Sequence, residues 1–374
     1  MERYNSIPTF LSEQLITYLG NKRKLIPYIE KEIQRICKFE EKERLSILEP
    51  FCGSGSVSRL LKLYSNHLVV NDLEWYATQL AKCYLSSPTQ EEYDIICDTI
   101  KTLNEYFDSL EFKNSKNPLF VNYYAPKDDK HIEQGERVYY TRENALRLDW
   151  YREQIYTQYP EWLQQYLIAP LIVESSIHTN TSGTFNSFLK RDGIGHFGGS
   201  GEHALSRILG RIKLQVPVFS YMPDTKVEIR NMDANELCRS IDNEFDVVYL
   251  DPPYNKHAYG TFYFMLNIVG QWRPEFIPPD NLRGQPDDWM RSDYNSFVRC
   301  ETAFRELIGS IRAKWIILSY NNEGILSEDR IMNILSSWGT VERREIQYPT
   351  YKACLNLDKR SKNVIEWLWI VKRY

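Results

Sequence analysis

Residues 45–72 read LSILEPFCGSGSVSRLLKLYSNHLVVND, and their pattern predicts the core of the fold. Ile47 and Leu48 predict a short strand, and a loop of Gly and Ser residues follows them. Residues 57–64 then have the apolar spacing of a helix, and HLVVND predicts a second strand that ends on an acid. A strand, a helix and a strand over this length predict two parallel strands, and therefore an α/β sheet.

The rest of the chain extends this pattern in both directions. Residues 21–38 predict an amphipathic helix, because Leu25, Ile29, Ile33 and Cys37 recur at helical spacing. Helical patterns dominate between residues 75 and 215, at 91–107, 141–155 and 160–176, and a Gly-rich, turn-prone segment follows at 182–201. Strands are predicted again at 217–231, 244–251 and 313–321, and a closing β-hairpin at 341–351 and 362–374. The prediction is a split α/β core with a mainly helical insertion.

Composition restricts the class of protein. The chain has 374 residues, of which 43% are hydrophobic and 26% charged, as in ordinary soluble domains. The formal net charge of -4 is unusual for a protein that coats DNA, although a local basic cleft remains compatible with it. The seven cysteines form no CxxC pair and no metal-like cluster, which favours a cytosolic protein with reduced thiols and no metal. No signal peptide or membrane span is predicted.

Three predicted strand ends carry residues suited to ligands, which bind beyond the carboxyl ends of parallel strands. At EPFCGSGS (49–56), Gly53 and Gly55 permit a close backbone approach to a ligand, or simply a turn between strand and helix. Asp72 suits the two hydroxyls of a ribose, or alternatively the N-cap of the next helix. DPPY (251–254) stops its strand with two prolines between an acid and an aromatic residue.

The DPPY stretch suits methylation of a nucleobase amine. Such an amine is a poor nucleophile, and two acceptors on its N–H groups would draw its nitrogen toward sp³ geometry. The Asp251 carboxylate is one acceptor, and the Pro252 carbonyl, held by the fixed φ of Pro252 and Pro253, is the second. Tyr254 offers a face on which a flipped base can stack. The expected reaction is alkylation of the amine by direct displacement.

Taken together, these segments resemble the D12 class (Dam-like) of DNA adenine-N6 methyltransferases, in order and over most of the chain. YLGNKRKLIP (18–27) is similar to the N-terminal cofactor motif of the family, with Tyr18 where Trp is usual and Asn21 where a second Gly is common. EPFCGSGS resembles the Asp-Pro-Phe-x-Gly-x-Gly motif, with Glu49 in place of Asp. IRNMDANEL (229–237) resembles the strand whose acid meets the cofactor adenine, and DPPY is the catalytic tetrapeptide.

Three further stretches, at 139–152, 258–269 and 318–326, resemble the type II restriction–modification subgroup of this class. The resemblance implies a Rossmann-like fold dependent on S-adenosyl-L-methionine (AdoMet), with a mixed sheet and a C-terminal hairpin. It implies a catalytic domain at 1–80 and 216–374 and a target-recognition insertion at 81–215. The implied substrate is double-stranded DNA, and a cognate restriction endonuclease would act separately.

The resemblance also assigns residues. The implied catalytic residues are Asp251, Pro252, Pro253 and Tyr254. The implied cofactor residues are Tyr18, Gly20, Lys22, Pro50, Phe51, Gly53, Ser54, Gly55, Asp72 and Asp233, of which Asp72 takes the ribose hydroxyls and Asp233 the adenine amine.

The insertion is the candidate for DNA recognition. Residues 183–215 carry five basic and two acidic residues, a local charge of +3 in a chain that is acidic overall. NSFLKRDGIG (186–195) predicts a hairpin or loop on which Lys190 and Arg191 could meet phosphate or guanine. Arg142 and Asn144 begin a predicted helix and could also contact phosphates. For each residue the alternative is a solvated charge or a helix cap, and His178, His196 and His203 have no metal-like spacing.

Two other functions remain open from the residues alone. An RNA adenine-N6 methyltransferase could use the same tetrapeptide. A catalytically silent nucleic-acid-binding module could keep the fold, although Asp72 and Asp251 are both present.

Overall fold

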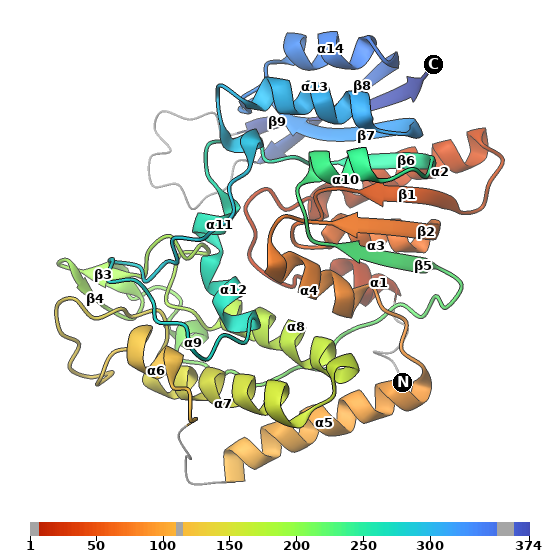
Figure 1. The fold of residues 1–374 in the computed structure, drawn as a ribbon. Helices are drawn as coiled ribbons and strands as arrows, with labels where there is room; N and C mark the ends of the chain where they lie inside the picture. The colour runs from red at the N-terminus through yellow and green to blue at the C-terminus, as the bar shows by residue number, and fades with distance from the viewer. Residues whose placement is uncertain (1–6, 110–114, 350–362) are drawn as a thin grey trace. The chain divides into compact units, whose positions relative to one another are not determined.

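The structure is a computed structural model that describes residues 7–109, 115–349 and 363–374. The chain forms two compact units (Figure 1). Unit 1 combines Met1–Gly20, Lys82–Tyr221 and Tyr259–Trp289, and unit 2 combines Asn21–Ala81, Met222–Ala258 and Met290–Tyr374. Unit 1 is therefore larger than the predicted insertion, because residues before Gly20 and after Tyr259 pack with the helical part. The division into catalytic and recognition domains stays a prediction.

Unit 2 is built on a seven-stranded sheet with strand order β5-β2-β1-β6-β7-β9-β8. The strands are β1 (Leu45–Glu49), β2 (Ser65–Asn71), β5 (Lys226–Arg230), β6 (Phe245–Leu250), β7 (Ala313–Asn321), β8 (Gly339–Pro349) and β9 (Asn363–Arg373). The first five are parallel, and β9 lies antiparallel between β7 and β8. The carboxyl ends of β1, β2, β5, β6 and β7 therefore meet along one edge, where the predicted site residues follow the strands.

Helices cover both faces of this sheet. The helices of unit 2 are η1 (Arg23–Leu25), α2 (Ile26–Phe39), α3 (Ser56–Leu63), α10 (Ala234–Ser240), η3 (Asp293–Asn295), α13 (Cys300–Ser310) and α14 (Glu328–Ser336); α4 (Trp75–Tyr84) begins in it. Figure 1 shows α10, α13 and α14 on one face and α2 and α3 on the other. Every residue of β6 is buried, as expected for a central parallel strand with both faces covered.

Unit 1 is mainly helical. It contains α1 (Ile7–Ser12), α5 (Gln90–Ser109), α6 (Leu119–Tyr123), α7 (Arg142–Gln158), α8 (Glu161–Ile177), η2 (Gly199–Gly201), α9 (Leu205–Ile208), α11 (Tyr259–Phe262) and α12 (Phe264–Gly270). Helix α8 packs against α5, α7 and α12. Thr141 caps the N-terminus of α7, because its hydroxyl accepts the N–H of Asn144 at 3.1 Å.

A two-stranded hairpin of unit 1 pairs β3 (Lys190–Arg191) with β4 (Ile194–Gly195). Its turn residues Asp192 and Gly193 both have positive φ, 52° and 84°, which is the backbone of a type I′ turn. The hairpin predicted within 186–195 is therefore confirmed.

Most predicted elements are confirmed, with two corrections. The prediction of a strand over 217–231 is wrong in its first half, since β5 covers only Lys226–Arg230; Pro217 and Pro223, which lack an N–H for the ladder, stand before it. The helix predicted over 21–38 begins at Ile26, because a 3-10 turn precedes it. The C-terminal hairpin is confirmed, although residues 350–362 lie outside the described ones.

Candidate active site

The loop between β1 and α3 brings the backbone of Gly53 and Gly55 to the carboxyl edge of the sheet. Both residues have positive φ, 53° and 73°, a conformation that residues with a side chain rarely adopt. The N–H of Gly53 donates to Oδ2 of Asp72 at 2.7 Å, which ties the ends of β1 and β2 together. A Cβ added at Gly55 would meet no atom within 4 Å, so open space borders this turn.

Neighbouring residues hold this loop in place. Ser54 is buried, and its hydroxyl accepts a hydrogen bond from Nδ2 of Asn21 at 3.3 Å, which links the N-terminal motif to the loop. The Pro50 carbonyl accepts the amide of Asn71 at 2.9 Å. The Phe51 ring lies edge-on to Tyr294, with ring centroids 5.2 Å apart.

Glu49, the last residue of β1, is a buried acid at this edge. Its side chain is 1% exposed, and its Oε2 has no hydrogen-bond partner in the described part of the chain. Burial raises the pKa of Glu49 to about 8; the nearby Ser58 hydroxyl lowers it, and the charges of Asp251 and Asp72 raise it further. Glu49 therefore stays largely protonated at neutral pH until a cation or donor reaches it.

Asp72 follows β2 and already uses both carboxylate oxygens. Oδ1 accepts the N–H of Glu74 at 2.8 Å, and Oδ2 accepts the N–H of Gly53. The bond to Glu74 is a capping interaction, which was the alternative to ribose binding in the sequence analysis. Burial raises the pKa of Asp72 to about 6, and the N–H groups of Glu74 and Gly53 limit the rise. Its role toward a ribose stays a prediction.

Asp233 is the N-cap of α10. Its Oδ1 accepts the N–H groups of Asn235 and Glu236 at 2.9 and 3.1 Å. Because β5 and β2 are neighbours in the sheet, Asp233 and Asp72 follow adjacent strands.

Asp251, the residue after β6, forms an ion pair with a buried lysine. Nζ of Lys22 lies 3.0 Å from Oδ1 of Asp251, and the Asp251 side chain is 19% exposed. The same ammonium lies over the ring of Tyr254, 4.9 Å from its centroid. Tyr254 also packs edge-on against Tyr320, and its carbonyl accepts the N–H of Ile325 at 2.8 Å. Two residues of the tetrapeptide thus share one cation.

The surroundings of Asp251 bring the pKa of its carboxyl close to neutral pH. Burial raises the pKa of Asp251 to about 6, and the charge of Lys22 limits the rise. Burial lowers the pKa of Lys22, but the charges of Asp251 and Glu366 together hold it well above its usual value. Burial raises the pKa of Tyr254 to about 12. At pH 7 Lys22 is therefore charged, and Asp251 is mostly charged.

Glu366 is a member of this cluster that the sequence analysis missed. It lies on β9 opposite Asn321, the last residue of β7, and its side chain is only 6% exposed. Its Oε2 has no hydrogen-bond partner among the described residues, and its charge raises the pKa of Asp251, Lys22 and Tyr254. A lone acid within the apolar run VIEWLWIV was the available signal.

Tyr18 and Gly20 belong to unit 1, whereas Lys22 belongs to unit 2. Tyr18 stacks on Tyr259 and Tyr263, with ring centroids 5.0 and 4.9 Å away. The Tyr259 hydroxyl donates to the Leu19 carbonyl at 3.0 Å, and the Leu19 N–H donates to the Tyr263 hydroxyl at 2.8 Å. The segment that follows DPPY therefore holds Tyr18 and Leu19, at the start of the N-terminal motif, in place.

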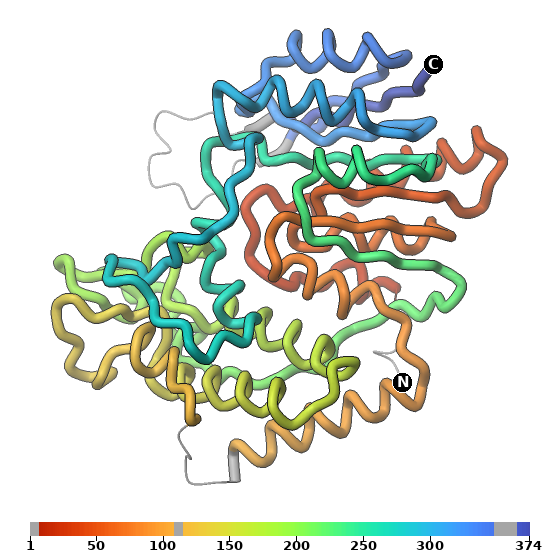
Figure 2. The backbone as a smooth tube through the Cα atoms, viewed as in Figure 1, coloured from red at the N-terminus to blue at the C-terminus, as the bar shows by residue number. Residues whose placement is uncertain are grey.

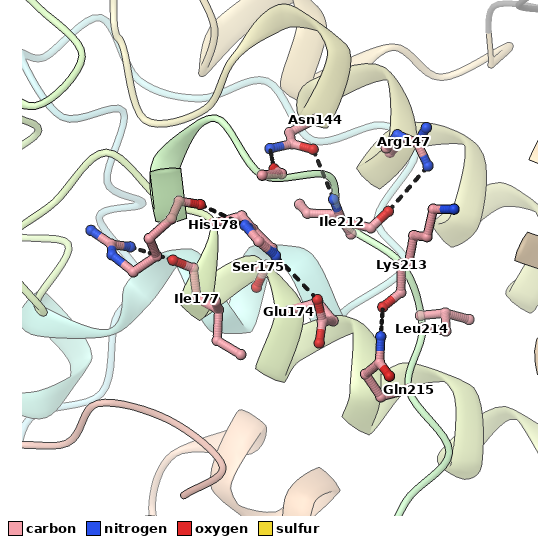
Figure 3. A network of polar contacts seen from close by, with 12 residues as sticks. Asn144, Arg147, Glu174, Ser175, Ile177, His178, Ile212, Lys213, Leu214 and Gln215 are labelled. Carbon is pink, nitrogen blue, oxygen red and sulfur yellow. Dashed lines mark hydrogen bonds and ion pairs between the residues drawn. The ribbon is translucent and has the colours of Figure 1, made fainter. Parts of the chain in front are cut away.

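Asn144 serves packing inside unit 1. Its side chain is 1% exposed, its amide donates to the Gly210 carbonyl at 2.8 Å and its carbonyl accepts the Ile212 N–H at 3.0 Å (Figure 3). This geometry argues against the predicted DNA contact for Asn144. Arg142 is exposed, and its N–H donates to Asp129, so its guanidinium lies at the surface near the start of α7.

The basic residues of 183–215 divide into structural and surface groups. Arg207 donates to the carbonyls of Ile177, Thr179 and Thr181, and its own carbonyl bonds to His178, whose other ring nitrogen lies near Glu174 (Figure 3).

By contrast, the hairpin residues Lys190 and Arg191 are only partly buried, and the Arg191 side chain is 39% exposed. Lys190 Nζ lies 5.0 Å from the Phe188 ring centroid, and Arg191 pairs with Glu202 at 2.7 Å. The surface group is the one that a phosphate backbone could reach.

Two further properties bear on the class of site. Within residues 7–109, 115–349 and 363–374, no group of three or more His, Cys, Asp or Glu side chains is arranged to hold a metal ion. In the same ranges, no helix combines the length and apolar character needed to cross a membrane.

Comparisons with known proteins agree on one family. A model of the D12 class N6 adenine-specific DNA methyltransferases matches residues 18–282. Type II methyltransferase M.NlaIII of Neisseria lactamica is 26% identical over 365 residues, which cover 96% of this chain and 99% of that protein. Modification methylase StsI of Streptococcus sanguinis is 30% identical, and Type II methyltransferase M.FokI of Planomicrobium okeanokoites 26%; each match covers 95% of this chain but only 52% of the relative. The chain therefore spans about half the length of these two proteins.

Proposed function

Because the chain belongs to the D12 class of N6 adenine-specific DNA methyltransferases, we propose that it transfers a methyl group from AdoMet to N6 of a flipped adenine in duplex DNA. The observation that carries the proposal is the cluster of Lys22, Asp251 and Tyr254 at the end of β6. It lies in the same compact unit as the Gly53–Gly55 loop and Asp72. The RNA substrate and the silent module have no specific observation in their favour.

The strand ends fit the cofactor chemically. AdoMet carries an ammonium group, two ribose hydroxyls and an adenine amine, which are donors that need acceptors. Glu49 offers a buried Oε2 without a partner among the described residues, and open space borders Gly55. We assign the ribose to Asp72 and the adenine amine to Asp233. The residues assigned to the methionine part are Tyr18, Gly20, Lys22, Pro50, Phe51, Gly53, Ser54 and Gly55.

In this mechanism the chain orients the amine and supplies its acceptors. Bound AdoMet supplies a methyl group on a sulfonium, which is transferred by direct displacement. The Asp251 carboxylate and the Pro252 carbonyl accept the two N–H groups of the adenine amine and direct its lone pair. Pro253 limits the backbone freedom of this turn, and Tyr254 provides the stacking face. Lys22 keeps Asp251 charged, because its ammonium lowers the pKa of that carboxyl.

Recognition of duplex DNA is assigned to the 81–215 insertion. We propose phosphate or base contacts for Lys190 and Arg191 on the β3–β4 hairpin and a phosphate contact for Arg142. The relatives named as type II methyltransferases and modification methylases support a role as the modification enzyme of a restriction–modification system, with a separate cognate endonuclease.

Methylation of DNA in cells provides the first test. Single-molecule sequencing of DNA from cells that express the protein is expected to report N6-methyladenine at one sequence context. Asp251→Ala is expected to abolish this signal and the transfer of tritiated methyl groups in vitro, while AdoMet binding persists. Methylation of RNA in preference to duplex DNA, or full turnover by Asp251→Ala, would contradict the proposal.

A further inference from the structure

We propose that Phe297 and Val298 form an apolar wedge that enters the base stack of duplex DNA beside the adenine being flipped. The inference rests on the proposed function, because an enzyme that extracts a base from the duplex must open the base stack beside it. Phe297 is 70% exposed and Val298 88% exposed, although both are large apolar residues and adjacent in sequence. Burying side chains of this kind stabilises a protein, so leaving two adjacent ones in water is unfavourable unless a partner covers them.

The exposed pair is held between two buried anchors. On one side, Tyr294 is 2% exposed, and its hydroxyl donates to Oδ1 of Asn235 at 2.6 Å. On the other side, Cys300 begins α13, is 1% exposed and donates its N–H to the Ser296 carbonyl at 2.9 Å. The wedge therefore lies in a short turn between two buried residues, which hold its position while a side chain enters the base stack.

The support is tied to the catalytic loop. The side-chain amide of Asn295 donates to the carbonyl of Asn255 at 2.7 Å and to that of His257 at 3.2 Å. Asn255 directly follows Tyr254, the proposed stacking face for the flipped base. The wedge thus belongs to the rim of the catalytic site in unit 2, and Figure 2 shows this part of the chain leading into α13.

The chemistry of the rim favours DNA over another occupant. Lys256, Arg291 and Arg299 are close in sequence to the wedge or to the residues that support it, as are two acids, Asp293 and Glu301. Both acids form ion pairs with arginines, Asp293 with Arg299 at 2.6 Å and Glu301 with Arg305 at 3.1 Å. The apolar wedge could contact the stacked bases, while the basic residues near it could contact the phosphates on either side. Proteins that unstack DNA use Phe, Leu, Ile, Met or Pro in this way. A flipped base also leaves a gap in the stack, which an aromatic side chain can fill.

The experiment compares Phe297→Ala, Val298→Ala and the double variant with the wild-type enzyme. The control is Met332→Ala, which removes an exposed apolar side chain from α14 in the same unit. The substrate is a duplex with the context found by sequencing, carrying 2-aminopurine at the target for fluorescence and adenine for turnover. Wild-type methylation is measured first, since its absence would defeat the proposed function rather than the wedge.

The double variant is expected to lose most of the 2-aminopurine fluorescence increase and about 10- to 100-fold in kcat/KM on paired duplex, from the cost of unstacking a base step. Its AdoMet affinity and the activity of Met332→Ala are expected to stay within twofold of wild type. A mismatch opposite the target, which lowers the cost of flipping, is expected to restore most of the lost activity. Equal losses on paired and mismatched duplex, unchanged kcat/KM, or loss of AdoMet binding would each overturn the wedge.

Discussion

Lys22 affects the charge of Asp251, the carboxyl proposed to be catalytic, because its ammonium lowers the pKa of that group. Lys22→Met keeps an unbranched side chain, one atom shorter, but removes the ammonium, so the pKa of Asp251 is expected to rise above its value of about 6. In the proposed mechanism the ionised Asp251 is the stronger acceptor for the amine N–H groups, so activity should fall as pH drops through that pKa. The acid limb of the kcat profile should move to higher pH, and activity at pH 7 should fall about tenfold if that pKa reaches about 8. Lys22→Arg, which keeps the charge, should hold the limb near its original position.

Glu366 provides the opposite test at the same carboxyl. Its negative charge raises the pKa of Asp251, so Glu366→Gln is expected to move the acid limb to lower pH. The same assays measure both variants. Lys22 and Glu366 carry opposite charges, so Lys22→Met and Glu366→Gln should shift the acid limb of the kcat profile in opposite directions. Shifts in the same direction would contradict the proposed effect of these charges on the pKa of Asp251.

Glu49 makes the stability of the ligand-free protein depend on pH. Its pKa is about 8 in the folded state against a usual 4.5. A group with a raised folded pKa contributes stability below pH 4.5, and this contribution is lost as pH rises through 8, by about 5 kcal/mol in all. Glu49→Gln should weaken the decline of the urea midpoint between pH 5 and 8, whereas Glu244→Gln, at an exposed site, should leave it unchanged. An identical decline in Glu49→Gln would contradict the prediction.

At the scale of elements, the turn from β1 into α3 depends on its glycines. Gly55→Ala places a side chain at a φ of 73°, which costs about 1–2 kcal/mol of stability, and puts a methyl group into open space beside the loop. A several-fold loss of AdoMet affinity by calorimetry is expected. Gly135→Ala is the matched control, because its φ is 94° with no atom near its Cβ, and it lies in unit 1. Equal affinity losses in both variants would mean that strain alone is responsible.

The β3–β4 hairpin is expected to contribute salt-dependent DNA affinity. If Lys190 and Arg191 each bind one phosphate, then Lys190→Ala and Arg191→Ala should each reduce the slope of log K against log salt concentration by about 0.9. Fluorescence anisotropy with duplex DNA at several salt concentrations measures this slope. Lys101→Ala, an exposed charge on α5, serves as control. A slope that stays unchanged in both hairpin variants would remove the hairpin from the interface.

Most elements could be predicted because their patterns are local. Apolar alternation, helical spacing and Gly or Pro punctuation identified the sheet strands, the long helices and the hairpin turn. The strand predicted over 217–231 failed in its first half, where the apolar residues are buried without a partner strand. Asn144 was proposed to contact DNA because residues at a helix N-terminus can bind phosphates, whereas tertiary packing buries its side chain.

The candidate site was predictable only in part, because some of its residues are brought together by long-range contacts. Motif order identified Lys22, Asp72 and Asp251, which follow or precede recognisable strands. Glu366 could not be placed, because its approach to Asp251 depends on the antiparallel register between β9 and β7. Register is a long-range property, and no local spacing in the sequence reports it.

At the scale of the whole molecule, the boundaries of the two compact units fall close to two of the motifs. The boundary at Gly20 and Asn21 falls within the N-terminal motif, and the boundary at Ala258 and Tyr259 falls four residues after Tyr254, the last residue of DPPY. Tyr18 and Gly20 therefore belong to unit 1, and the other residues proposed to bind the cofactor belong to unit 2.

The pairing of β1 with β6 has a consequence for synthesis of the protein. Ile47 pairs with Val247, about 200 residues later in the chain. At a translation rate of about 5–20 residues per second, β1 waits roughly 10–40 s on the ribosome before its second neighbour is made. Unit 1 is largely synthesised during that interval, and its folding would shorten the loop that β1 and β6 must close. Until then one edge of β1 lacks its partner strand, and an unpaired strand edge can pair with another chain and lead to aggregation.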